Sequence, residues 1–197
     1  MRFLAITLFG LMSTLSALAA EPGYNCQPER GCKELQGPTY ELGRGATISL
    51  PKGWKVYSYP TAPDPIMEGL REIRAINDGL VIAISPFPNI DHRDFPEETL
   101  CEMMKKAGSR YVPVAKELVV TPVPASREGV LVSCKVSFTA KNEGEKPFSV
   151  LPNRRHASVT SMVIAYQKDV VFSVSLVSER APDEAYQAAT SALEQIQ

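Results

Sequence analysis

Alternation of apolar and polar residues predicts β-strands along most of the chain beyond residue 45. The predicted strands cover residues 46–50, 54–59, 71–76, 80–85, 117–123, 129–139, 156–167 and 170–177. Trp54, Val56 and Ser58 fall on one face of their strand, and we expect Trp54 to anchor the core. The dipeptide Asp78-Gly79 between two apolar runs predicts a tight antiparallel hairpin.

Two segments have the periodicity of amphipathic helices. The first runs from about Phe95 to Arg110, where Asp94 offers an N-cap oxygen and Glu97 follows three residues on. Its apolar face consists of Leu100, Met103, Met104 and Ala107. The second helix starts near Pro182, and its stripe consists of Ala185, Tyr186, Ala189, Leu193 and Ile196. Hairpins, a helix, a strand meander and a terminal helix predict an α+β fold, an antiparallel β-sheet flanked by helices.

The first 20 residues have the pattern of a secretory signal peptide. Arg2 precedes a short apolar run, and small residues place cleavage after Ala19 or after Ala20. The apolar run is shorter than the roughly 20 residues of a spanning helix, and no charged stop-transfer flank follows it. We therefore expect a periplasmic protein with no transmembrane segment in the mature chain.

The rest of the chain divides into a lead and one domain. Residues 21–43 are polar and rich in turn formers, and we expect them to form an irregular lead closed by a disulfide. Residues 44–197 are long enough for a single α+β domain with its own core. The formal net charge of −1, without basic clusters, argues against a nucleic-acid partner.

Four cysteines, Cys26, Cys32, Cys101 and Cys134, lie beyond the signal peptide. In an exported chain an even number of cysteines indicates disulfides, and four cysteines allow three pairings. We favour Cys26 with Cys32, because the short loop between them contains Pro28 and Gly31, and this leaves Cys101 for Cys134. A zinc site is the alternative, but the paired short spacings of such sites are absent.

Catalytic and metal motifs are weak. Ser49 and Lys52 match S-x-x-K, but Pro51 and the following glycine forbid the helix that this motif requires. The chain has two histidines. His92 lies near Asp94, but this aspartate is better explained as the helix cap than as a metal ligand. His156 follows two arginines at the start of a strand, a basic edge that discourages aggregation. We therefore predict no enzyme, no metal and no cofactor.

Two proline-framed apolar loops are candidates for contact with another protein. One contains Phe87 and Ile90, and the other contains Phe148 and Leu151 followed by two arginines. The candidate partner-binding residues are Phe148, Leu151, Arg154, Arg155, Phe87 and Ile90. Apolar anchors beside arginines are the residue types that interface centres favour. The alternative is that these apolar side chains fold back on the core.

Leu50-Pro51-Lys52-Gly53-Trp54, the Asp78-Gly79 hairpin, the central helix and the strand meander with its terminal helix resemble the PsbP-like fold. The resemblance covers residues 46–197 and implies an α/β/α sandwich with an antiparallel sheet between helices. It also implies a function in binding another protein, since members of this fold usually act in that way. Some exported, disulfide-stapled bacterial proteins of this general build are immunity proteins.

The leading hypothesis is thus a periplasmic protein-binding module, most concretely an immunity or inhibitor protein that neutralises an antibacterial effector. The alternative is a binder of a small, lipid-like ligand or an envelope accessory protein. We base this alternative on Met103, Met104, Tyr57 and Tyr59, which we expect to line a cleft between the sheet and the first helix.

Overall fold

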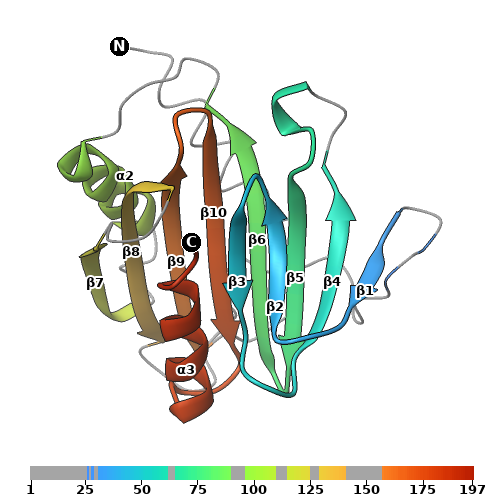
Figure 1. The fold of residues 1–197 in the computed structure, drawn as a ribbon. Coiled ribbons are helices and arrows are strands. Elements are labelled where there is room, and N and C mark those ends of the chain that lie inside the picture. The colour runs from blue at the N-terminus through green and yellow to red at the C-terminus, as the bar shows by residue number, and fades with distance from the viewer. Residues whose placement is uncertain are drawn as a thin grey trace.

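The computed structural model describes residues 26, 28, 31–61, 65–89, 96–109, 115–124, 129–140 and 157–197, except for the side chains of residues 66, 107 and 109. These residues form an eight-stranded sheet in which all neighbouring strands are antiparallel (Figure 1). Its strands, in spatial order, are β1 (Lys33–Leu35), β4 (Lys55–Pro60), β5 (Arg71–Asn77), β6 (Leu80–Pro88), β10 (Val170–Ser178), β9 (Ser158–Tyr166), β8 (Val130–Ala140) and β7 (Ala115–Val123).

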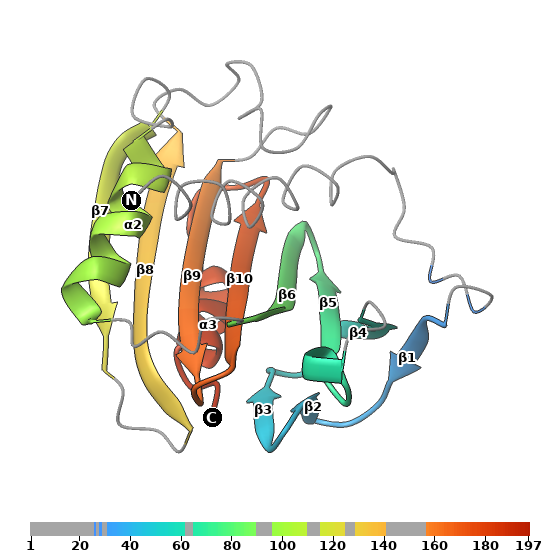
Figure 2. The ribbon, with the colours of Figure 1, turned by 90° about the horizontal axis from the view of Figure 1, so that it is seen from above.

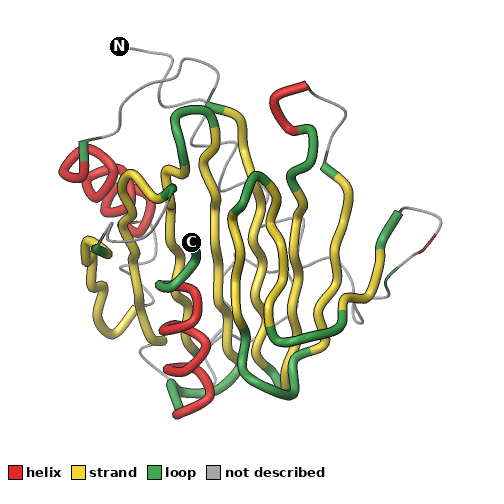
Figure 3. The backbone as a smooth tube through the Cα atoms, viewed as in Figure 1, coloured by secondary structure: helices red, strands yellow, loops and turns green. Residues whose placement is uncertain are grey.

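Smaller elements complete the fold (Figure 3). They are the hairpin of β2 (Thr39–Gly43) with β3 (Ala46–Ser49), the single 3-10 turn η2 (Pro65–Met67), and the helices α2 (Glu97–Ser109) and α3 (Glu184–Leu193). The protein therefore has the predicted α+β class, an antiparallel sheet packed with two helices.

The two helices cover opposite faces of the sheet (Figures 1 and 2). Side chains alternate between the faces of a strand. Along β9, Met162 and Ile164 join a large cluster with α3, whereas Val163 and Ala165 join a smaller cluster with α2. The largest fully buried members of the large cluster are Leu42, Ile48, Ile73, Leu80, Ile82, Ile84, Met162, Ile164, Phe172 and Leu176. The α2 cluster consists of Leu100, Met104, Val132, Cys134, Val136, Val163, Ala165 and Val171.

The predicted Asp-Gly hairpin joins β5 to β6, with Asn77 opposite Leu80. Asp78 has φ 37° and Gly79 has φ 80°. Two successive positive φ values give the chain the twist that a two-residue hairpin needs, which explains the choice of an Asp-Gly pair.

Two sequence predictions are wrong in detail. Residues 33–43 are not irregular, because they contain β1 and β2. Phe87 does not lie in a loop, because β6 extends to Pro88 and Phe87 pairs with Val171 of β10. β5 pairs with β6 only as far as Ile84 of β6. Pro86 and Pro88 lie beyond that point, so no β5 residue there requires the backbone N–H that proline lacks.

Helix α3 begins as predicted, since the Asp183 side chain accepts a hydrogen bond of 2.9 Å from the Tyr186 backbone N–H. Tyr186, Ala189 and Leu193 are buried on its sheet-facing stripe, whereas Ala185, which we expected there, is exposed. The one-turn spacing places Tyr186 and Ala189 on the stripe, and Ala185 falls on its margin.

A chain of hydrogen bonds connects β8, β9 and α3 beneath the large cluster. Ser137 shares a hydrogen bond of 2.9 Å with Thr160, which shares one of 2.7 Å with the Tyr186 hydroxyl. Burial raises the pKa of Tyr186 to about 12, and the hydrogen bond with Thr160 opposes this effect. The neutral phenol is therefore strongly favoured in the folded protein.

This shift predicts a loss of stability in alkaline solution. In the unfolded chain Tyr186 loses its proton near pH 10, but in the folded chain only near pH 12, so the folded state holds more protons in between. The stabilisation is fully present below pH 10 and is lost as the pH rises through 12, by about 2 kcal/mol. Urea unfolding at several pH values should show this fall, and Tyr186→Phe should make it shallower. An equally steep fall in the variant would contradict the assignment.

Two buried serines should respond in opposite ways to alanine. Ser58 is 1% exposed, and its hydroxyl has no hydrogen-bond partner among the described residues, whereas Ser133, at 0%, donates to the Val123 carbonyl oxygen at 3.0 Å. Ser58→Ala removes an unsatisfied group and should leave the free energy of unfolding unchanged or raise it by about 1 kcal/mol. Ser133→Ala should lower it by about 1 kcal/mol, as measured by urea unfolding. A larger loss for Ser58→Ala would show that its hydroxyl is bonded.

Candidate functional site

Most of the residues predicted to contact a partner lie outside the described part of the chain. These are Phe148, Leu151, Arg154, Arg155 and Ile90, together with the two histidines, His92 and His156. Phe87 is described, and it lies half-buried in β6. The partner surface predicted around Phe148 and Arg154 therefore stays a prediction.

The residues proposed to line a cleft between the sheet and the first helix do not come together. Met104 is buried in the α2 cluster, beside β8 and β9. Tyr57 and Tyr59 lie on β4, beyond β10, β6 and β5 in the order of the sheet. The sequence pattern failed here because it places residues on elements but does not say which strands lie under the helix.

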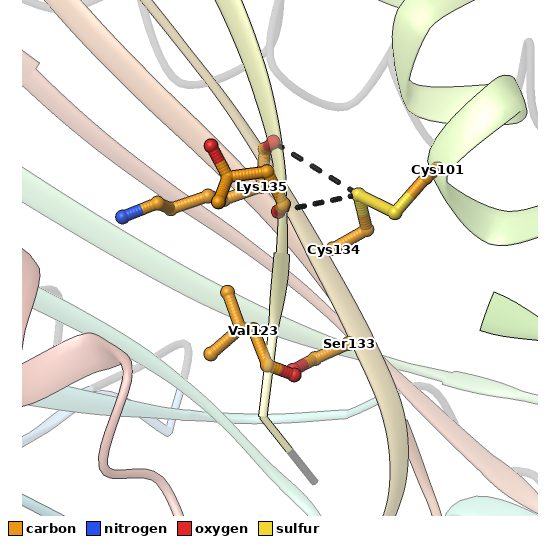
Figure 4. The surroundings of a disulfide bond; sticks show 6 residues. Cys101, Val123, Ser133, Cys134 and Lys135 are labelled. Carbon is orange, nitrogen blue, oxygen red and sulfur yellow. Dashed lines mark hydrogen bonds between the residues drawn. A yellow bond between two sulfur atoms is a disulfide. The ribbon is translucent and has the colours of Figure 1, made fainter. Parts of the chain in front are cut away.

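The disulfide between Cys101 and Cys134 staples α2 to β8 (Figure 4). The two Cα atoms lie 5.3 Å apart, and Cys134 is fully buried. Its sulfur approaches the Thr121 carbonyl oxygen at 3.4 Å, a close contact only, since a disulfide sulfur has no proton to donate. This bridge confirms one predicted pairing and fixes the helix on its face of the sheet.

The second disulfide, Cys26 with Cys32, confirms the other pairing and precedes β1 directly. The Gly31 N–H donates to the Pro28 carbonyl oxygen at 2.9 Å inside this small loop, and Cys32 is buried. Because β1 has only three residues, the covalent loop supplies an anchor that so short a strand lacks by itself.

A groove of about 370 Å³ opens beside this anchored strand. We call it the Trp54 groove. Its lining consists of Glu34, Leu35, Gln36, Gly37, Pro38, Tyr40, Leu50, Pro51, Lys52, Gly53 and Trp54. The residues come from β1, its connection to β2, Tyr40 of β2 and the connection from β3 to β4. A disulfide-anchored edge and these two connections therefore form its walls.

Local sequence explains why the walls take these positions. Gly37 has φ 116° and Gly53 has φ 98°, backbone conformations that glycine adopts without strain, so each chain turns sharply at the groove. The Leu50 N–H donates to the Pro38 carbonyl oxygen at 3.0 Å and joins the two walls. Trp54 packs against the large cluster and is only half-buried, because its other side faces the groove.

The lining of the groove combines apolar, aromatic, polar and charged side chains. Leu35, Tyr40, Leu50 and Trp54 supply apolar and aromatic surface, and burial raises the pKa of Tyr40, which keeps this phenol neutral. Glu34, Gln36 and Lys52 add charged and polar groups to this lining. Such a surface can hold a ligand by contact area, hydrogen bonds and charge.

Ser49 and Lys52, which match a catalytic motif in the sequence, have separate structural roles. Ser49 ends β3, and its hydroxyl shares a hydrogen bond of 2.9 Å with Thr39 of β2. Lys52 lies exposed in the turn that follows. The extended backbone at Ser49 agrees with the expectation that Pro51 prevents a helix.

A second aromatic cluster lies on β4 and β5. The Arg74 guanidinium lies 4.8 Å from the centre of the Tyr59 ring and forms an ion pair of 2.7 Å with Glu72. Arg74 pairs with Tyr57, on the face of the sheet opposite to Val56. The carboxylate already satisfies the arginine, so this cluster stabilises the strand pair.

Sequence reasoning missed the Trp54 groove, although a signal was present. Residues 50–54 appeared as a fold signature, with Trp54 as a core anchor. Glycine and proline occur together at Gly37-Pro38 and again in residues 51–53, each beside an aromatic residue. Two sharp turns next to aromatic side chains are typical of a loop-built binding surface.

The described part of the chain contains no helix long and apolar enough to cross a membrane. The same residues bring together no group of three or more histidine, cysteine, aspartate or glutamate side chains that could hold a metal ion. In comparisons with known proteins, no family model, no curated protein and no solved structure matches this chain.

Proposed function

We propose that this chain is an exported protein-binding module that holds its partner at the Trp54 groove. The observation that carries this proposal is a groove lined by aromatic, proline and leucine side chains together with Glu34, Gln36 and Lys52, on a disulfide-anchored framework. Rigid walls bind a partner without losing much conformational entropy. Tryptophan and tyrosine are also the side chains that interface centres favour.

The disulfides and the signal-peptide pattern both support an exported location for the protein. Both disulfides fit an oxidising compartment. The signal-peptide pattern, with cleavage after Ala19 or Ala20, supports the periplasm of a bacterium as that compartment.

The most concrete form of the proposal is an immunity or inhibitor protein that neutralises an antibacterial effector reaching the periplasm. The resemblance to the PsbP-like fold supports it, since members of that fold usually act by binding another protein. An inhibitor also benefits from a stable framework, and two disulfides provide one. Phe148, Leu151, Arg154 and Arg155 are proposed to extend the contact beyond the groove.

A small-ligand function is the second candidate. The groove volume of about 370 Å³ falls in the lower part of the range for ligand pockets, and Trp54 and Tyr40 offer rings for stacking. A thermal-shift screen separates the two candidates. A small molecule or lipid that raises the melting temperature favours this one, whereas a shift caused only by a protein favours the first.

Co-purification from the periplasm tests the leading proposal. The tagged protein should retrieve one protein partner, and Lys52→Glu should lower the recovery because it reverses a charge inside the groove. Lys116→Glu is the matched control, an exposed lysine on β7 at the other end of the sheet. The proposal fails if the protein elutes alone and a deletion strain shows neither toxin sensitivity nor loss of an envelope complex.

A further inference from the structure

The sheet ends beside the Trp54 groove in the edge strand β1. Among the described strands, β1 pairs with β4 alone and stands at one end of the sheet (Figure 1). In an antiparallel pair, backbone groups point alternately toward the neighbour and away from it. Part of the N–H and C=O groups of β1 therefore point outward, where a further strand can pair with them.

The two ends of the sheet differ in how they receive another strand. At the far end, β7 contains Pro122, which has no N–H to donate to an incoming strand. Strand β1 contains no proline. The edge strand without a proline is thus the one that adjoins the groove.

β1 is also held in place before any partner arrives. Cys32, bonded to Cys26, precedes the strand, and Leu35 at its other end packs against the large cluster. An anchored strand loses little entropy when a second strand pairs with it.

The Trp54 groove lies next to β1 and can receive side chains of an added strand. Glu34, Leu35 and Gln36 line the groove, so a strand laid along β1 passes its mouth. Successive residues of a strand point to opposite faces of the sheet, so every second side chain of the added strand lies on the face where Leu35 and Trp54 pack against the large cluster. Backbone pairing with pockets for alternate side chains is a general mode of peptide recognition.

Charges around the groove select among extended segments. Lys52 and Glu34 are the charged residues of the lining, and Lys33, Lys55 and Glu41 each adjoin a lining residue in the chain, so lysines outnumber glutamates by three to two around the groove. All three lysines are exposed. A segment with acidic residues on its outer positions complements this rim.

We propose that the occupant of the Trp54 groove is an extended, acidic segment of the partner protein, which adds to the sheet beside β1 and inserts an apolar side chain against Trp54. This inference rests on the proposed protein-binding function and specifies the ligand of the same site. The wall residues position the segment by contact and charge, and no covalent step is involved.

A synthetic probe tests the inference without knowledge of the partner. The probe is a capped octapeptide of alternating glutamate and valine, and the control replaces each glutamate by lysine. Trp54 is the only tryptophan in the chain, so its emission reports occupation of the groove directly. The acidic peptide should change this emission with saturation and bind at least about tenfold more tightly than the lysine peptide. Lys52→Glu should reverse the preference, and Lys116→Glu should leave it unchanged.

Amide hydrogen exchange supplies the backbone readout. Bound acidic peptide should slow exchange at amides of residues 33–36 by at least about tenfold and leave the amides of β7 unchanged. Absence of a saturable emission change, or an emission change without slower exchange in β1, overturns the inference. Capture of a periplasmic partner that depends on Lys52, with a peptide that does not bind, refutes this inference and leaves the proposed function standing. A peptide that binds without any captured partner refutes the proposed function instead.

Discussion

The double variant Cys101→Ala/Cys134→Ala is expected to lose about 4 kcal/mol of unfolding free energy, against about 2 kcal/mol for Cys26→Ala/Cys32→Ala. The reason is the length of chain that each bridge closes. The first spans a sequence separation of 33 residues and the second a separation of 6. A bridge that closes a longer loop removes more conformational entropy from the unfolded chain.

The comparison is well matched, because each bridge joins a buried cysteine to a half-buried one. Urea unfolding followed by Trp54 emission measures both variants. An equal loss, or a larger loss for the short loop, would show that chain entropy does not set the order. Binding should respond in the opposite order, since the short bridge anchors β1 beside the groove.

Phe172→Ala should cost about 4 kcal/mol, which is a large part of the stability of a domain of this size. Phe172 is 0% exposed in the large cluster, and its ring meets that of Tyr166 edge to face, with centroids 5.6 Å apart. Truncation removes buried apolar surface and an aromatic contact, and it leaves a cavity between β10 and the elements packed on it.

Leu131→Ala is the control for this change, since Leu131 is 51% exposed and should lose no more than about 0.5 kcal/mol. Urea unfolding of both variants gives the two values on one scale. A loss below about 2 kcal/mol for Phe172→Ala would mean that the cluster collapses into the space, contrary to the packing described here.

Local chemistry explains which parts of the fold were predictable. The Asp78-Gly79 hairpin and the start of the last helix near Pro182 depend on residues within a few positions of one another, and both occur as predicted. The cysteine pairing also followed from short-range reasoning, because closing the loop from Cys26 to Cys32 leaves one pairing for the remaining two.

Most of the failures come from long-range contacts. β1 is too short to show an alternation, and it forms a strand because a disulfide and the distant strand β4 order it. Residues 39–42 of β2 do alternate, with Tyr40 and Leu42 buried, and were overlooked because they follow a polar lead. Phe87 was assigned to a loop because prolines flank it. β6 nevertheless pairs with β10 through both prolines, and β5 no longer pairs with β6 on the other side, where their N–H groups would otherwise be needed.

The Trp54 groove depends both on local sequence chemistry and on contacts between segments. Its turns were visible as glycine and proline in the sequence, and the half-buried tryptophan was identified as a core residue. The hollow itself exists because residues 34–40 meet residues 50–54 across the hairpin. No periodicity in one segment reports a contact with another, so the site required the structure.

Site-specific photo-cross-linking in the periplasm can show whether a partner protein occupies the Trp54 groove. Gln36 lines the groove and is exposed, and replacing it with benzoylphenylalanine places a photoreactive group at the mouth. The same replacement at Gln187, exposed on α3, serves as the control. We expect a covalent adduct with one protein at Gln36 and none at Gln187. An exported, folded Gln36 variant that forms no protein adduct, or an adduct at Gln187 alone, would contradict it.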